Sequence, residues 1–343
     1  MSSSSITGAL AGFFESLWPS DAPPAEPAGL DRAAWRSLAG LGLHLVDIEE
    51  EHGGSGGALA DLIQIALLCG RHAADLPVVE GHLAAWALAA SGVEVDPAYA
   101  YTVPFGAVEV SVDGAGHATG ELRDVPWGGS ADRVIAVTGD GLLLSVDPAH
   151  TAVTAGHDLA GQPRDRLVLD GVPMAPAASA ISAGDLALRA AVLRTAQMAG
   201  AMQAVAELTH RYTGERTQFG KPIGTFQAVQ AHLVELQQMA VMTTSLAERL
   251  GSRARPAAFD VMAAKLIADE NALAVARAAH QAHGAIGMTR EYRLHLFTRR
   301  LHTWHGDGGD TLAWAGLLGA ATAAAPSFSA VVLDEDHRPE VHP

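Results

Sequence analysis

The chain has 343 residues, which is long enough for two or three domains with hydrophobic cores of their own. Hydrophobic residues make up 49% and charged residues 17%, a composition that argues against an intrinsically disordered chain. Its 22 basic and 38 acidic residues give a formal net charge of −16, which disfavours nucleic acid as a partner but allows a small anionic ligand.

The sequence features that report on location predict a cytoplasmic protein. Met1 to Ile6 is serine-rich, and no basic stretch precedes an apolar run, so we expect no secretory signal. No uncharged apolar stretch approaches the ~20 residues that a membrane span needs, so we expect no membrane partner. The single cysteine, Cys69, cannot form an intrachain disulfide, which fits a reducing compartment.

Residues 1–100 are predicted to form an N-terminal helical domain. Apolar residues recur there at spacings of three and four, the period of a helix with one buried face: Trp35, Leu38, Leu41 and Leu45. A glycine cluster at 53–57 interrupts this pattern and is more typical of a flexible turn than of a phosphate-binding loop. A second helix is expected at Leu59–Leu68.

Residues 101–182 are predicted to form a β-domain. Valines alternate with polar residues over Val108–Val112, which is the period of a half-buried strand. The apolar runs Val134–Val137 and Leu142–Val146 flank a Gly-Asp-Gly turn at 139–141, which predicts a hairpin. Short strands separated by turns indicate a small antiparallel barrel or sandwich.

Residues 183–325 are predicted to be helical again, and residues 326–343 to be a loose tail. No proline interrupts Phe226–Arg255, which allows a helix of up to ~45 Å, long enough for a helical bundle. The low-charge stretch Leu312–Ala325 is predicted to be a packed helix.

Four polar residues near the C-terminus have the spacing of site residues but carry weak signals. His302 and His305 could lie on one helix face, yet no Cys or Glu stands at ligand spacing, so no metal site is predicted. Asp307 and Asp310 lie in a glycine-rich segment and could supply a base or a cation ligand. The plain interpretation is a solvated loop or a helix start, since Asp stabilises helix N-termini.

Two stretches carry the sharpest signal for a ligand. Residues 216–227 (RTQFGKPIGTFQ) join two helices, and an arginine fork beside glycines suits a pyrophosphate. Residues 281–287 (QAHGAIG) have small side chains that would let the backbone approach a ligand. Either stretch alone is equally compatible with an ordinary turn between helices.

Taken together, these stretches resemble the signatures of the acyl-CoA dehydrogenases. Residues 216–227 match R-x-x-F-G-x-P-I…F-Q, and residues 281–287 match Q-x-x-G-x-x-G. Glu49 to Gly56 (EEEHGGSG) resembles the family's P-E-E-Y-G-G-x-G loop. The resemblance covers about 30–325. It implies a mainly α fold with a small β-domain, in the order N-terminal helical domain, middle β-barrel or sandwich, and C-terminal four-helix bundle.

The resemblance also implies FAD as the cofactor, held across a subunit interface. The C-terminal signatures of one subunit would clasp the ADP half of the flavin that is bound mainly by its neighbour. Arg216 and Gln218 would meet the pyrophosphate, and Phe219 and Gln227 would lie near the adenine end. The remaining signature residues would line the same ADP path: Gln281, Gly284 and Gly287.

Two departures from the family pattern concern catalysis. The T-E-P-x-x-G-S-D segment that meets the flavin ring is missing between residues 101 and 182, where Pro126–Ser130 is the nearest stretch. Gly308 and Ala190 occupy the two usual positions of the catalytic carboxylate, counted from Gln281 and Arg216. Neither residue can accept a proton, so we predict no catalytic residue in this chain.

A chain that keeps the ADP signatures but lacks the catalytic base resembles the non-catalytic subunit of heteromeric α2β2 acyl-CoA dehydrogenases of actinobacterial steroid degradation. In this hypothesis the partner is a catalytic paralogue that supplies the flavin-ring site, the base and the acyl pocket. The reaction is α,β-desaturation of an acyl-CoA thioester, with a steroid-derived one as a candidate. Two alternatives remain open: a homomeric flavoenzyme with Asp307 or Asp310 as base, and a non-redox acyl-CoA-binding or scaffold protein.

Overall fold

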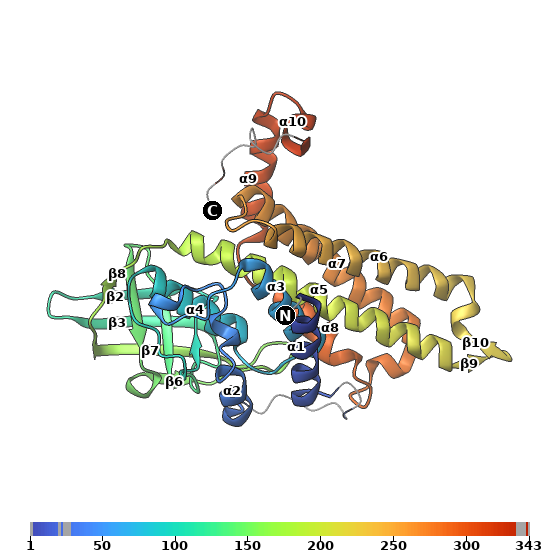
Figure 1. Cartoon of the computed structure of the whole chain (residues 1–343), viewed down its shortest axis with the longest axis horizontal. Coiled ribbons are helices and arrows are strands. Elements are labelled where there is room, and N and C mark those ends of the chain that lie inside the picture. Colours follow the sequence, from blue (N-terminus) through green and yellow to red (C-terminus); the bar gives the residue numbers. More distant parts are fainter. Residues whose placement is uncertain (1–2, 20–21, 23–28, 334–340, 342–343) are drawn as a thin grey trace. The chain divides into compact units, whose positions relative to one another are not determined.

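The computed structural model describes residues 3–19, 22, 29–333 and 341, and it divides into two compact units (Figure 1). The mainly helical unit and the unit with the strands interleave along the sequence. The helical unit comprises Met1–Pro24, Ile63–Ala74 and Ala191–Pro343, and the other comprises Ala25–Leu62 and Asp75–Ala190. The order of helices, then strands, then helices confirms the predicted fold class, whereas the domain boundaries stay a prediction.

Two four-stranded sheets build the core of the second unit. One has the strand order β1-β4-β5-β8 and the other β2-β3-β7-β6, and all pairs are antiparallel except β1 with β4. Their inward side chains form one apolar cluster that includes Leu122, Val134, Leu144 and Leu167, so the sheets make a small sandwich. The strand bounds are Tyr101–Thr102, Val108–Val112, His117–Pro126, Arg133–Val137, Leu142–Val146, Ala152–Thr154, Arg164–Pro173 and Ala177–Ala178, for β1 to β8.

The predicted hairpin is confirmed, because β4 and β5 pair with Val134 opposite Val146 and Val137 opposite Leu143. The helix expected through Trp35 and Leu45 is wrong in its second half. Helix α2 (Arg32–Ala39) ends before Gly42, whose φ of 65° lies in the left-handed region that ends helices. Leu41 is consequently 56% exposed, and Leu45 is buried from a separate 3₁₀ turn, η1 (Leu43–Leu45). Helix α4 (Val78–Ala90) also belongs to this unit.

Long helices form the other unit, and their apolar faces meet in one core that includes Met202, Leu236, Val275 and Phe297. Glycines let the helices around residues 59–71 and 183–215 pack backbone to backbone. A Cβ at Gly70 would lie 1.8 Å from the carbonyl oxygen of Gln197, and a Cβ at Gly200 would lie 1.9 Å from the carbonyl oxygen of Leu67. The helix bounds are Ser3–Leu17, Leu59–Arg71, Ala183–Glu215, Gln227–Gly251, Ala258–His283, Leu294–His305, Thr311–Ala324 and Phe328–Leu333, for α1, α3 and α5 to α10.

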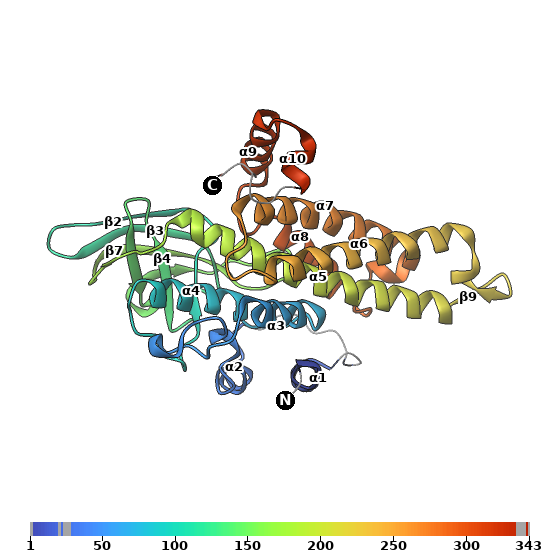
Figure 2. The ribbon, with the colours of Figure 1, turned by 45° about the horizontal axis from the view of Figure 1, so that its top comes forward.

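The last two helices, α9 and α10, project from this bundle in both views (Figures 1 and 2). The low-charge stretch after Leu312 is a helix as predicted, but it packs on one side only. Leu312 is 84% exposed, and only Trp314 and Ala321 of α9 are buried. Helix α10 lies in the segment predicted as a loose tail, of which 334–340 and 342–343 lie outside the described residues. None of the described helices is long and apolar enough to cross a membrane.

Candidate functional site

The first signature forms a short hairpin between α5 and α6. Strands β9 (Thr217–Gln218) and β10 (Lys221–Pro222) pair across Phe219 and Gly220, whose φ values of 52° and 78° are the left-handed ones that a tight two-residue turn needs. Phe219 is 91% exposed at the tip, although a bulky side chain at positive φ is a strained arrangement. The chain thus displays an aromatic ring to solvent at a conformational cost.

The polar residues of this signature are also at the surface. Arg216, Gln218 and Gln227 are exposed. In the part of the chain that the structure describes, the Arg216 guanidinium has no ion-pair partner, while Lys221 lies over the Phe226 ring at 4.5 Å. An exposed guanidinium without an internal carboxylate remains available to an external anion, such as a pyrophosphate.

The second signature forms the turn at the end of α7. Gln281 and Gly284 are exposed, and Gly284 has φ 65° with open space where a Cβ would point. Gly287 is buried and closely packed, and a Cβ there would lie 2.8 Å from the Cβ of His283. Gly284 can therefore present its backbone to a ligand, whereas Gly287 serves the fold of the turn itself.

The structure brings these two signatures together at one end of the bundle. Tyr212, one turn before Arg216, stacks on His283, with ring centroids 4.7 Å apart and planes at 18°. The exposed arginine, the exposed amides and the open glycine turn fit the pyrophosphate and ribose of an ADP moiety. They offer hydrogen-bond donors, and no side chain keeps a ligand away from the backbone of the turn. Sequence reasoning did not single out Tyr212.

The segment around Gly308, where the resemblance predicts a catalytic carboxylate, contains a buried ion pair. Asp307 Oδ2 lies 3.0 Å from Arg194 Nη2, and both side chains are buried, at 5% and 1% exposure. The expectation of a solvated loop is therefore wrong for Asp307, because a guanidinium from α5 draws its carboxylate inward. For Asp310 the helix-start interpretation is confirmed, since it accepts hydrogen bonds from the amides of Leu312 and Ala313.

A second buried pair on α7 lies close to the first. Lys265 Nζ donates to Asp269 Oδ1 at 2.5 Å and to the carbonyl oxygen of His305 at 3.3 Å. Burial lowers the pKa of Lys265 and raises the pKa of Asp269. The charge of each residue opposes the shift of the other, and the charge of Asp307 also opposes the shift of Lys265. Thr311 also donates to Asp269. Sequence reasoning missed this pair. The available signal was the spacing of four residues between Lys265 and Asp269 in an otherwise apolar helix.

The two usual base positions hold residues without a proton acceptor. Gly308 follows Asp307 with φ 85°, and Ala190 is buried on α5. Its neighbour Arg189 is already engaged: Nη2 donates to Asp47 Oδ2 at 2.7 Å and Nε donates to His82 Nε2 at 3.0 Å. Burial, then the arginine charge, holds the pKa of His82 well below its usual value.

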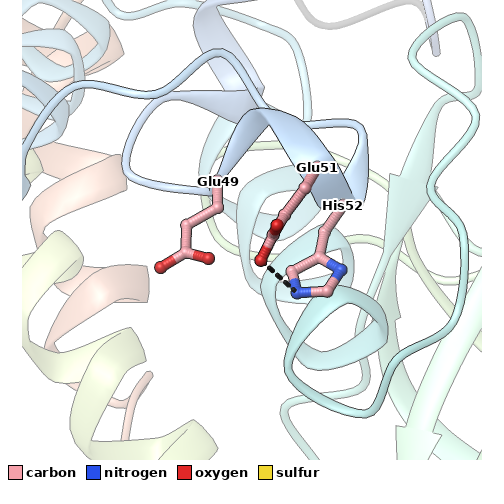
Figure 3. A group of neighbouring side chains, drawn as sticks. All are labelled: Glu49, Glu51 and His52. Carbon is pink, nitrogen blue, oxygen red and sulfur yellow. Dashed lines mark ion pairs between the residues drawn. The ribbon is translucent and has the colours of Figure 1, made fainter.

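The Glu49–Gly56 loop is a tightly packed turn. A Cβ at Gly54 would lie 2.0 Å from the carbonyl oxygen of Ile48, so only glycine fits there. Figure 3 shows Glu49, Glu51 and His52, whose ligand atoms lie within 4.8 Å of one another. This is the one group of three or more possible metal ligands among the described residues, so His302 and His305 belong to none. Both glutamates are exposed, and exposed acidic groups gather often without an ion.

Comparison with known proteins is consistent with this geometry. Residues 187–309 match the family model "Acyl-CoA dehydrogenase, C-terminal domain". Acyl-CoA dehydrogenase IpdE2 of Mycolicibacterium smegmatis is 29% identical over 281 residues, which cover 80% of this chain and 83% of the relative. This chain is therefore similar to acyl-CoA dehydrogenases over most of its length, and its residues 187–309 match the C-terminal domain of that family.

Two solved structures share the fold of this chain. The ChsE4–ChsE5 complex of Mycobacterium tuberculosis has the same fold, with a TM-score of 0.79 at 22% identity over 94% of this chain and 98% of the other. The Tcur3481–Tcur3483 steroid ACAD G363A variant is 27% identical, with a TM-score of 0.77 over 94% and 99%.

Proposed function

We propose that this chain is the non-catalytic subunit of a heteromeric, FAD-dependent acyl-CoA dehydrogenase. It supplies the ADP half of the FAD site to a catalytic paralogue in an α2β2 assembly. Arg216 and Gln218 hold the pyrophosphate, and Phe219 and Gln227 face the adenine end. Gln281 and Gly284 form the adjoining wall, and the buried Gly287 holds their turn in shape.

The observation that carries the proposal is a contrast within one chain. The signature residues proposed to bind ADP are exposed, apart from Gly287, while the base positions hold Gly308 and Ala190. The nearest carboxylate, Asp307, faces Arg194 at 3.0 Å. Its carboxylate is buried against a guanidinium and is therefore not positioned to approach the α-carbon of a substrate.

The assembled enzyme would oxidise an acyl-CoA thioester at its α and β carbons. Bound FAD would supply the hydride acceptor for the β-carbon, and a carboxylate of the partner subunit would take the α-proton, which would leave an enoyl-CoA. This chain's part is to bind and orient the ADP moiety. Both neighbours named above pair two differently named proteins, and one is a steroid ACAD, so a steroid-derived acyl-CoA is the first substrate to test.

The decisive experiment is to co-express the chain with candidate paralogues and to measure FAD per complex by absorbance. We expect two FAD per α2β2 tetramer and no turnover when the partner's catalytic carboxylate is removed. Asp307→Asn and Asp310→Asn should leave kcat near wild type. Four FAD per tetramer would refute the proposal. A thousandfold fall in kcat with an intact fold on mutating either Asp would instead establish the homomeric Asp-base alternative.

A further inference from the structure

Three aromatic side chains meet where the two signatures begin. Tyr212 near the end of α5 stacks on His283, the last residue of α7. Tyr292, two residues before α8, completes the group, at 5.7 Å from Tyr212 and 5.0 Å from His283 between ring centroids. All three separations lie in the range of about 4.5–7 Å at which aromatic rings attract one another. One aromatic contact thus joins three segments of the chain.

The first signature is connected to this contact through its backbone. The Arg216 amide donates to the Tyr212 carbonyl oxygen at 2.9 Å, and the Ile223 amide donates to the Arg216 carbonyl oxygen at 2.8 Å. The position of Tyr212 therefore determines where the Arg216 side chain starts and where the hairpin closes.

The second signature is connected through His283 itself. Gly284 follows directly with its left-handed φ, and the turn curls back until Gly287 packs against the His283 side chain. The position of the imidazole therefore determines where Gln281 and the open glycine turn lie.

The hydrogen bonds of His283 leave its orientation to the ring contacts. Its Nδ1 donates to the Ala279 carbonyl oxygen at 2.8 Å, and burial lowers its pKa, so the ring is neutral near pH 7. Its Nε2 is buried and has no hydrogen-bond partner among the described residues. Stacking on Tyr212 and the tilted contact with Tyr292 are consequently what holds the outer half of the ring.

We propose that the Tyr212–His283–Tyr292 stack is a positioning element that holds the two signatures in one register. Arg216 and Gln281 then meet the ADP half of FAD as a single surface, since binding groups must be held to within about 0.5 Å to act together. The identity of the ligand rests on the proposed function, whereas the coupling of the two segments rests on the contacts alone.

The coupling is tested first, on the full chain without FAD. Tyr212→Leu removes the ring and keeps apolar volume, Tyr212→Phe keeps the ring, and Tyr99→Leu removes a ring from the separate Tyr99–Tyr101 pair. We expect Tyr212→Leu to raise amide hydrogen exchange about three- to tenfold, the scale of one aromatic pair, in both 216–226 and 281–288. Tyr212→Phe and Tyr99→Leu should leave both segments unchanged. Faster exchange in only one segment, or in neither, would overturn the proposal.

The link to the cofactor is tested next, by titrating FAD into the complex with the catalytic paralogue. Tyr212→Leu should weaken FAD binding about three- to tenfold, and Tyr212→Phe should restore it, while Tyr99→Leu lowers the melting temperature alone. Unchanged FAD affinity beside coupled exchange would overturn the positioning role. A wild-type complex without FAD would refute the proposed function, and the exchange data would still decide whether the stack couples the two segments.

Discussion

At the scale of single residues, Arg216 tests the cofactor proposal most directly, because its guanidinium is exposed and has no carboxylate partner in the described part of the chain. Arg216→Ala should weaken FAD retention in the complex by ~1.5–3 kcal/mol, the scale of a hydrogen bond to a charged group. Arg216→Lys should restore it only in part, since the planar fork is lost. Equilibrium dialysis of the complex measures both. A variant that melts earlier but keeps its FAD would mark Arg216 as structural.

His44 makes a separate prediction about pH. It is fully buried against Trp35, and burial lowers its pKa from 6.5 to about 4. As the pH falls, His44 is therefore protonated in the unfolded chain before it is protonated in the folded one. Its contribution to the free energy of unfolding is present above pH 6.5 and is lost between pH 6.5 and pH 4. Between pH 7 and 5 the loss should be about 2 kcal/mol.

His44→Phe isolates this contribution, because it keeps an aromatic ring beside Trp35 and removes the titrating nitrogens. Urea unfolding at pH 7 and pH 5 should show a smaller acid loss in the variant than in the wild type. The matched control is His150→Phe at an exposed position, which should keep the full loss. Equal losses in the wild type and in His44→Phe would contradict the assignment.

At the scale of elements, the buried charges tie α5 to the segment between α8 and α9, and α7 to the adjoining ends of those two helices. Arg194→Met should destabilise the chain by roughly 3–5 kcal/mol, because it removes the guanidinium that faces the buried Asp307. The double variant Arg194→Met/Asp307→Leu should be more stable than the single one, since no uncompensated charge is then buried. Urea unfolding measures both.

The control for this prediction is the exposed pair of Arg277 and Glu235, whose arginine side chain is 70% exposed. Arg277→Met should cost less than about 1 kcal/mol, because water screens that pair. If Arg194→Met cost no more than this control, the buried pair would not hold the α8–α9 segment.

At the scale of the whole molecule, exposed apolar side chains predict that the chain needs a partner. Leu312 on α9 is 84% exposed, and Val234, Val241 and Met242 on α6 are each about half exposed. Apolar surface of this kind marks interfaces, and obligate interfaces are large and hydrophobic. We expect the chain alone to aggregate or to lack flavin, and to elute as a defined heterotetramer with its paralogue in light-scattering chromatography. A stable, yellow, active homotetramer would contradict this.

The sequence by itself determined the features that depend on neighbours in the chain. Alternating valines predicted β2, the two apolar runs around Gly139–Gly141 predicted the β4–β5 hairpin, and Asp310 was recognised as a helix start. Each depends on interactions a few residues apart, and a local pattern records those. The signatures at 216–227 and 281–287 likewise led to the resemblance to acyl-CoA dehydrogenases, because each is a short turn whose residue types are set by its own geometry.

Only the tertiary structure decided what depends on contacts between distant segments. Asp307 is buried because Arg194 reaches it from another helix, and nothing in its glycine-rich surroundings records that. Leu312 is exposed because no described element covers α9 on that side, although its sequence reads as a packed helix. Tyr212 and His283 meet only when α5 and α7 pack together. Burial and pairing of side chains arise from long-range packing, which a single chain's local pattern does not contain.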